Sequence, residues 1–497
     1  ALPEPSPRPE AGAHTTVCGD GARAGHAQRA QGGEEPAEAE SGSSPAAPPP
    51  PRAPAASQLA SLSLAGCLSL TPACLKSLGP VLRACALLSH LDVSRTPAVT
   101  DASLDHLLET SPTSLTSLDL SGTRVEHPRI HLPCLQRLHL ANCDALVGPS
   151  IKCPLVTAVD LSGSERLRTP ALASAALGAL RLEGCSNLEV LGLACPGLRR
   201  CTLYRCGLGP SALSAALTRV PVLTLLDISG SRNLDWLELE ASVPLLRTLV
   251  LSWCPRLAAV RLTHLPSLRT LRAHGCSGIA TVNVLDCPSL CTLELQKCRA
   301  LRDDAAAALV AHLPALRTLN LSSCTRLRAP ALRSASMEAL HLFNCVGLEG
   351  LTLVTPRLRL LNCTYCAALR HLRVTQDEAV GPGPAPQAPG EVRRHQAALA
   401  LEGARSHAAL DAALLAGCKS LPDEQVRGLL ASCPALTNLE LRACSALSQQ
   451  VLEEAAEQCR RVQRAEATRS REASAATPCT DADSQITLTR TSSPGAW

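Results

Sequence analysis

The sequence predicts an α/β solenoid, in which one short structural unit is stacked many times. A nine-residue pattern, L-x-x-L-x-L-x-x-C, recurs along most of the chain, for example from Leu135 to Cys143 and from Leu290 to Cys298. Large rings that fill ordinary protein cores are scarce, with three Trp, two Tyr and one Phe among 497 residues. One copy of the pattern cannot bury its own leucines, so stacked copies must bury them together.

We count sixteen copies of this pattern. They begin at Leu59, Leu88, Leu115, Leu135, Val156, Leu177, Leu198, Leu223, Leu246, Leu268, Leu290, Leu316, Met337, Leu358, Leu410 and Leu436. Positions four and six of each copy alternate with polar residues as in a short strand with one buried face. The pattern is that of a leucine-rich repeat, and it predicts a curved α/β leucine-rich-repeat solenoid of about sixteen repeats with parallel strands on its concave face.

The second half of each repeat is of two kinds, which predicts a convex side of mixed structure. In repeats 6, 8, 9, 10, 13 and 14 the L-x-x-L-x-L pattern recurs, which predicts a second extended segment. Repeats 3, 4, 5 and 12 carry a central proline that is compatible with extended chain but not with a helix. These prolines are Pro128, Pro149, Pro170 and Pro330.

Repeats 1, 2, 7, 11 and 15 are longer, and their extra residues predict short helices. Thr71-Pro72 has the form of an N-cap followed by proline in the first turn. Thr100-Asp101, Pro210, Asp303 and Asp423 open similar segments. After repeat 16, residues 449–464 are expected to form a helix that caps the open end of the core. Leu59 has no comparable cap before it, so we expect further structure upstream.

The composition divides the chain into three parts. Residues 1–56 are rich in proline and predict a disordered linker, because they cannot bury enough apolar surface to offset the entropy of ordering. Residues 57–464 are the solenoid, with an irregular insertion at 375–405. Residues 465–497, rich in Ser, Thr and Arg, predict a disordered tail.

The cysteines are expected to be structural. Twelve of the 25 occupy repeat position nine: Cys67, Cys143, Cys185, Cys206, Cys254, Cys276, Cys298, Cys324, Cys345, Cys366, Cys418 and Cys444. The other four repeats place Thr or Ser there, so the position requires a small side chain that can bond to backbone carbonyls, and disulfides are not its purpose. In the C-x-x-C at Cys363 and Cys366, Cys363 occupies a buried leucine position and Cys366 occupies position nine, which favours a structural role over metal or redox chemistry. Reduced thiols without a signal peptide predict a cytoplasmic or nuclear protein.

Charge and motifs argue against several classes of function. A net charge of +4 is too small to imply nucleic acid or a membrane surface as partner. We find no P-loop, G-x-S-x-G, H-E-x-x-H or paired metal motif, so we expect no enzyme, no cofactor and no metal. His139, His274 and His341 fall at exposed positions, as side chains of a solvated face.

Repeated aspartates offer an alternative that we consider weaker. Asp92, Asp119, Asp160 and Asp227 recur at position five, and neighbouring strands would place Asp92 and Asp119 about 5 Å apart. A paired-carboxylate catalyst is conceivable. A repeated solvated residue fits better, because the aspartate recurs with the repeat and not at one site.

Large side chains near the end of the concave strands predict a protein-binding face. Four of the aromatic residues occupy positions seven and eight of repeats 7 to 14, where small residues dominate elsewhere. Aromatic and arginine side chains supply most binding hot spots. The candidate residues are Tyr204, Arg205, Trp253, Arg272, His274, Lys297, Phe343 and Tyr365.

The repeats resemble those of the F-box/LRR proteins. Residues 418–444, C-K-S-L-P-D-E-Q-V-R-G-L-L-A-S-C-P-A-L-T-N-L-E-L-R-A-C, are similar to that family's cysteine-containing unit. Residues 191–198, L-G-L-A-C-P-G-L, resemble the large plant and green-algal members. The resemblance covers roughly residues 57–460. It implies repeats that hold a protein substrate while an F-box binds a Skp1-type adaptor of a cullin-RING ubiquitin ligase, although residues 1–56 contain no F-box pattern.

Two functions follow from these observations. The first is the substrate-recognition part of an SCF-type ubiquitin ligase, non-catalytic, which acts in ubiquitin-dependent protein catabolism and meets its adaptor only if an F-box lies upstream of Ala1. The alternative is a leucine-rich-repeat scaffold or adaptor unrelated to ubiquitination.

Overall fold

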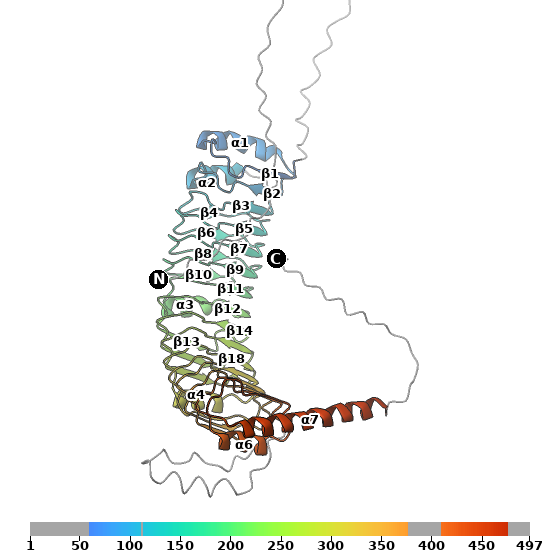
Figure 1. Ribbon diagram of the computed structural model, residues 1–497. Coiled ribbons are helices and arrows are strands. Elements are labelled where there is room, and N and C mark those ends of the chain that lie inside the picture. The colour runs from blue at the N-terminus through green and yellow to red at the C-terminus, as the bar shows by residue number, and fades with distance from the viewer. Residues whose placement is uncertain (1–58, 111–112, 376–408, 476–497) are drawn as a thin grey trace, which may run out of the picture. The chain divides into compact units, whose positions relative to one another are not determined.

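A single parallel sheet of sixteen strands, one from each repeat, runs through the protein and makes it a leucine-rich-repeat solenoid (Figure 1). The computed structural model describes residues 59–110, 113–375 and 409–475. The spatial order of the strands in this large sheet follows their order in the chain. The fold class predicted from the repeat is therefore confirmed, with one strand for each of the sixteen copies.

The strands of the large sheet are short and nearly identical in length. In spatial order they are β1 (Ser61–Ser63), β2 (His90–Asp92), β3 (Ser117–Asp119), β5 (Arg137–His139), β7 (Ala158–Asp160), β9 (Ala179–Arg181), β11 (Arg200–Thr202), β12 (Leu225–Asp227), β14 (Thr248–Val250), β16 (Thr270–Arg272), β18 (Thr292–Glu294), β19 (Thr318–Asn320), β21 (Ala339–His341), β23 (Leu360–Asn362), β25 (Ala412–Leu414) and β26 (Asn438–Glu440). Each covers positions three to five of its repeat.

Hydrogen bonds between repeats continue beyond these strands. The N–H at position six donates to the carbonyl of position five in the next repeat, as from Leu295 to Asn320 (2.8 Å). The N–H at position eight donates to the carbonyl of position seven, as from Lys297 to Ser322 (2.8 Å). Neighbouring repeats are thus held in one register from position three to position eight.

The second half of each repeat, which we call the return side, forms three smaller parallel sheets. They comprise β4 (Arg129–Ile130), β6 (Ser150–Lys152), β8 (Ala171–Ala173) and β10 (Gly192–Ala194); β13 (Trp236–Glu240), β15 (Ala259–Thr263) and β17 (Thr281–Leu285); and β20 (Ala331–Arg333), β22 (Gly350–Val354) and β24 (His371–Thr375). These ten strands belong to the ten repeats for which an extended return half was predicted.

Helices replace the return strand in the five longer repeats, as expected, and they separate the three smaller sheets. They are α1 (Pro72–Ala84), α2 (Asp101–Thr110), α3 (Pro210–Leu217), α4 (Asp303–Ala311) and α6 (Asp423–Ser432). Thr71 caps α1, because its side chain accepts a hydrogen bond from the N–H of Cys74. A return side of mixed strands and helices is therefore confirmed (Figure 1).

Leucines at positions one, four and six fill the space between the two sides. Leu290, Leu293 and Leu295 of repeat 11 are fully buried, and the same positions are buried in nearly every repeat. Each repeat lies against two neighbours, so its leucines complete a core that no repeat could form alone.

The predicted role of position nine is confirmed in its geometry. Eleven of the twelve cysteines at this position direct their thiol to the position-six carbonyl of the preceding repeat, as Cys276 does to Leu251 (2.9 Å) and Cys298 to Ala273 (3.2 Å). Thr96 and Ser164 make the same bond through hydroxyl groups. Thr123 and Ser231 instead bond to the position-six carbonyl of their own repeat. The column of bonds therefore ties most repeats to the one before and is interrupted at these two.

The last helix differs from its predicted length. We expected a capping helix over residues 449–464 followed by a disordered tail, but α7 (Gln449–Ala475) continues through the first residues assigned to that tail. Its buried Val451 and Ala455 cover the end of the core, as a cap should. The predicted linker at 1–56, residues 376–405 of the predicted insertion and residues 476–497 lie outside the described residues.

Candidate functional site

Position eight has a left-handed backbone in all sixteen repeats. Seven repeats place glycine there: Gly66, Gly122, Gly163, Gly184, Gly230, Gly275 and Gly417. The other nine place a residue with a side chain: Arg95, Asn142, Arg205, Trp253, Lys297, Ser323, Asn344, Tyr365 and Ala443. We call this column of side chains, together with position seven beside it, the turn row.

Residues other than glycine are strained at this position. A left-handed conformation costs an L-amino acid about 1 kcal/mol or more, because Cβ approaches the following carbonyl oxygen. Glycine has no such cost, and asparagine tolerates the conformation better than most residues. Trp253 (φ 60°) and Tyr365 (φ 62°) are the bulkiest residues to adopt it here. Bulky residues held in such a conformation point to a role other than folding.

Trp253 lies at the centre of one cluster in the turn row. Its ring meets the ring of His274 edge to face, with centroids 5.7 Å apart. The ammonium group of Lys297 lies 5.1 Å from the centre of the Trp253 ring, as a cation–π contact. The Nδ1 atom of His274 is 2.7 Å from the hydroxyl of buried Ser252, which fixes the imidazole beside the indole.

Gly275 makes the Trp253 cluster possible. A Cβ at Gly275 would stand 2.5 Å from the Trp253 ring, so the ring lies directly over this glycine. Trp253, Gly275 and Lys297 occupy position eight of three successive repeats. Because Gly275 in the middle repeat has no side chain, Lys297 can reach across that repeat to the indole of Trp253.

Tyr365 and Phe343 form a second cluster on the same plan. Their rings meet edge to face with centroids 5.6 Å apart. The Tyr365 ring covers Gly417 of the following repeat, where a Cβ would stand 2.6 Å from the ring. Tyr365 thus uses the next glycine of the column as Trp253 uses Gly275.

Tyr204 and Arg205 form the third cluster. The guanidinium carbon of Arg205 lies 5.1 Å from the centre of the Tyr204 ring. Gly230 lies beneath them, because a Cβ there would meet both side chains within 3.4 Å. Arg272, the eighth predicted residue, lies apart from the turn row. It occupies position five of its repeat, at the end of β16, and its Nε is 3.4 Å from a Glu294 carboxylate oxygen.

Three of the four rings in the first two clusters are strongly exposed and stand outside the leucine core. Trp253 is 51% exposed, Tyr365 55% and Phe343 40%. Seven of the eight predicted residues therefore lie in the turn row, and they gather into three groups rather than one. With about 4.8 Å between strands, Trp253 and Tyr365 are about 24 Å apart along the sheet.

The glycines under the rings are the part of the site that the sequence analysis missed. A signal was present in the sequence, because seven repeats have glycine at position eight. In five cases this glycine belongs to the repeat that follows one with a larger residue at position eight, namely Arg95, Asn142, Arg205, Trp253 and Tyr365. The pattern L-x-x-L-x-L-x-x-C leaves position eight undefined, so its left-handed backbone was not predicted.

Aspartates at position five have a local structural role. Each of the four carboxylates accepts the N–H of the residue two positions further on, as Asp119 does from Ser121 (2.8 Å). Asn320 and Asn362 accept in the same way. The carboxylates stabilise the exit of the strand, which accounts for their recurrence with the repeat.

Cys363 and Cys366 are fully buried and form no disulfide. The thiol of Cys366 donates to the carbonyl of Leu342 (3.0 Å), and the backbone carbonyl of Cys363 accepts the thiol of Cys418 (3.2 Å). Within residues 59–110, 113–375 and 409–464, no three His, Cys, Asp or Glu side chains gather as a metal site would require. No helix in the described part of the chain is both long enough and apolar enough to span a bilayer.

Comparisons with known proteins find no family for this chain and weak likenesses to solved structures. No protein-family model matches the chain, and no curated protein matches it. Among solved structures, a leucine-rich repeat protein from Bacteroides ovatus is 15% identical and is matched over 59% of this chain and 70% of its own, with a TM-score of 0.30. The functional domain of InlJ from Listeria monocytogenes, which includes a cysteine ladder, is 17% identical over 64% of this chain and 69% of its own, with a TM-score of 0.28. YopM from Yersinia enterocolitica is 16% identical over 78% and 89%, with a TM-score of 0.27. We draw no functional conclusion from likenesses at these scores.

Proposed function

We propose that this protein is a non-catalytic recognition solenoid that binds a protein partner along the turn row of repeats 7 to 14. The observation that carries the proposal is the occupant of position eight. Trp253 and Tyr365 are held exposed and in a left-handed conformation at positions where glycine serves the fold equally well. Exposed aromatic rings that lower the stability of the fold are explained if they contribute free energy to the binding of a partner.

The charges in the turn row indicate the chemistry of the partner surface. Lys297 and Arg205 both lie beside a ring, and neither forms an ion pair with any of the described residues. A partner that presents apolar side chains flanked by carboxylates would satisfy both the rings and the two cations. Arg272 contributes less, because Glu294 already balances its charge.

Glycine substitutions test this proposal without disturbing the core. We expect the double variant Trp253→Gly, Tyr365→Gly to keep or slightly raise the melting temperature, because glycine relieves the left-handed strain. The same change should weaken partner capture about fivefold or more. Capture is measured by quantitative mass spectrometry of proteins retained from extract by the full chain.

Ser323→Gly is the matched control, because it makes the same backbone change at position eight without removing a ring. It should retain the full set of captured proteins. If the double variant unfolds, the rings are packing residues. If it captures the same proteins as the original chain, the binding surface lies elsewhere.

We further propose that the partner is the substrate of an SCF-type ubiquitin ligase in the cytoplasm or nucleus. This is supported by the resemblance of Cys418–Cys444 to the F-box/LRR repeat. The proposal requires an F-box in chain that precedes Ala1 and binding of that F-box to a Skp1-type adaptor. The sequence upstream of Ala1 and co-purification of the adaptor with the longer chain test it. A longer chain that lacks both leaves the alternative, a scaffold or adaptor unrelated to ubiquitination.

A further inference from the structure

Strand β17 ends one of the return sheets, so one of its edges has no neighbouring strand. β17 pairs with β15 on one side, and on the other side it faces helix α4. Thr281 donates its N–H to Ala258, and Leu285 accepts from His264, so these residues face β15. Backbone groups alternate in direction along a strand, so Val282 and Val284 present their N–H and carbonyl groups to the α4 side.

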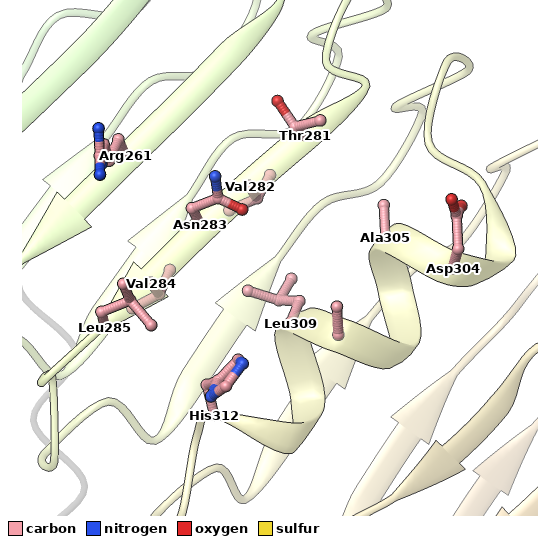
Figure 2. Close-up of a pocket in the computed structure, with 11 residues that line it drawn as sticks. Arg261, Thr281, Val282, Asn283, Val284, Leu285, Asp304, Ala305, Leu309 and His312 are labelled. Atoms are coloured by element: carbon pink, nitrogen blue, oxygen red, sulfur yellow. The ribbon is translucent and has the colours of Figure 1, made fainter.

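A notch separates this edge from the helix. It has a volume of about 400 Å³ and lies between Val282 and Val284 of β17 and Ala305, Ala308 and Leu309 of α4. Figure 2 shows the strand and the helix facing each other across it, with Asp304 and His312 at the two ends of the helix. In the described part of the chain no acceptor bonds to the N–H of Val282 or Val284 from α4.

A second place in the solenoid where a strand edge faces a helix shows which group can bond to such an edge. β24 ends the third return sheet and faces α6 as β17 faces α4. There the Oε1 atom of Gln425 accepts the N–H of Leu372 at 2.9 Å. An amide carbonyl from α6 thus satisfies the edge of β24.

The two helices align residue by residue, and the decisive position differs. Asp303 and Asp423 open them, and the buried residues fall at the same places. In this alignment Ala305 of α4 is equivalent to Gln425 of α6, and Val282 of β17 is equivalent to Leu372 of β24. The carbonyl that satisfies the β24 edge therefore has no counterpart at β17, because alanine has none. The junction of β10 with α3 offers an edge of only three residues.

We propose that the notch between β17 and α4 binds an extended segment of a partner protein, which pairs with β17 as an added strand. The edge of five residues is about 16 Å long and matches such a segment in length. Backbone carbonyls of the segment accept the N–H groups of Val282 and Val284, as Gln425 does at the other junction. The small Ala305 and Ala308 leave room for its side chains. This site is separate from the turn row and does not depend on the function proposed there.

The test uses the full chain and a defined peptide. The probe is an acetylated, amidated and fluorescein-labelled copy of Ala259–Thr263, the strand sequence that already pairs with β17. Anisotropy should report saturable binding, and hydrogen exchange should slow at Val282 and Val284. The same peptide carrying N-methyl groups on alternate backbone amides should bind about tenfold more weakly, because it cannot complete the ladder.

Two matched variants locate the binding. Ala305→Gln rebuilds the Gln425 arrangement, so it should slow exchange at Val282 without peptide and weaken peptide binding about tenfold. Gln425→Ala should leave binding at β17 unchanged. Failure of the original chain to bind the peptide, or binding that Ala305→Gln does not weaken, would overturn the proposal. Concentration-dependent self-association that Ala305→Gln abolishes, with no peptide bound, would assign the notch to a second copy of this chain instead.

Discussion

A thiol and a hydroxyl are interchangeable at position nine because each donates one hydrogen bond from a small side chain. The sequence alone predicts this, since Thr96, Thr123, Ser164 and Ser231 stand where other repeats have cysteine. It does not reveal the direction of the bond. In most repeats the acceptor is the carbonyl of the preceding repeat, which only the stacking geometry could show.

Cys298 provides the first prediction at this scale. Cys298→Ser should lower the free energy of unfolding by about 1 kcal/mol or less, because the hydroxyl can still reach the Ala273 carbonyl. Cys298→Leu should cost about 1–3 kcal/mol through overpacking of a fully buried position. Urea denaturation of the two variants measures both values. An equal loss of free energy of unfolding in the two variants would mean that position nine tolerates a large side chain, which would contradict the requirement for a small one.

His341 provides a prediction about pH. His341 was predicted to lie on a solvated face, but it is partly buried in the structure. This burial lowers its pKa below the ordinary value of 6.5. The unfolded chain therefore binds a proton near pH 6.5 that the folded protein does not bind until lower pH. Stability consequently falls as pH drops below about 6.5 and is fully present above it.

His341→Asn isolates this effect, because Asn320 and Asn362 occupy the same position in the two adjacent strands. Between pH 7 and pH 5 the variant should lose less free energy of unfolding than the original chain. Urea titrations at three pH values measure the difference. Parallel loss in both proteins would show that other groups govern the acid response.

The elements of the return side were largely predictable because each has its own local signal. Strands followed from a recurrent L-x-x-L-x-L or a central proline, and helices followed from Thr71, Asp303 and Asp423 at their starts. Whether a helix covers the strand edge before it could not be predicted. That outcome depends on one residue, Gln425 or Ala305, and the Leu372 N–H that Gln425 meets lies 53 residues earlier in the chain.

Asp303 supports a prediction at the scale of the element. Its carboxylate accepts the N–H groups of Arg328 and Ala329, each at 2.9 Å, and so ties α4 to the following repeat. Asp303→Ala should lower the free energy of unfolding by about 1–2 kcal/mol, because two backbone donors lose their acceptor. Asp303→Asn should lose less, since one oxygen remains. Urea denaturation decides, and an unchanged Asp303→Ala would show that water replaces the carboxylate without cost.

Across the whole molecule, stability is a sum over neighbouring repeats, because each repeat contacts only those beside it. The ends need covers for the same reason. At the C-terminal end α7 provides one, with Gln458 bonding to the Leu430 carbonyl (2.9 Å) and Gln463 to the Thr437 carbonyl (2.8 Å). The sequence predicted this cap. Its greater length was not predicted, because the charged residues after Arg464 match the composition of a tail.

Deletion of residues 449–497 should unfold the solenoid from one end. Repeats 15 and 16 should lose protection from hydrogen exchange, because Leu439 and Leu441 would face solvent. Repeats 3 to 10 should keep theirs. Deletion of residues 476–497 alone is the control and should change neither group. Loss of protection throughout the chain would contradict nearest-neighbour stability and indicate one cooperative unit.

Position eight also bears on how such a protein can acquire a new binding partner. Its backbone already accommodates glycine, serine, arginine and tryptophan in otherwise equivalent repeats. Substitutions confined to this single column leave the leucines and the thiol bonds untouched. Evolution, or a designer, could therefore change the binding specificity of the solenoid by substituting this row of outward side chains. The repeats that carry the row would keep their core, with little loss of stability.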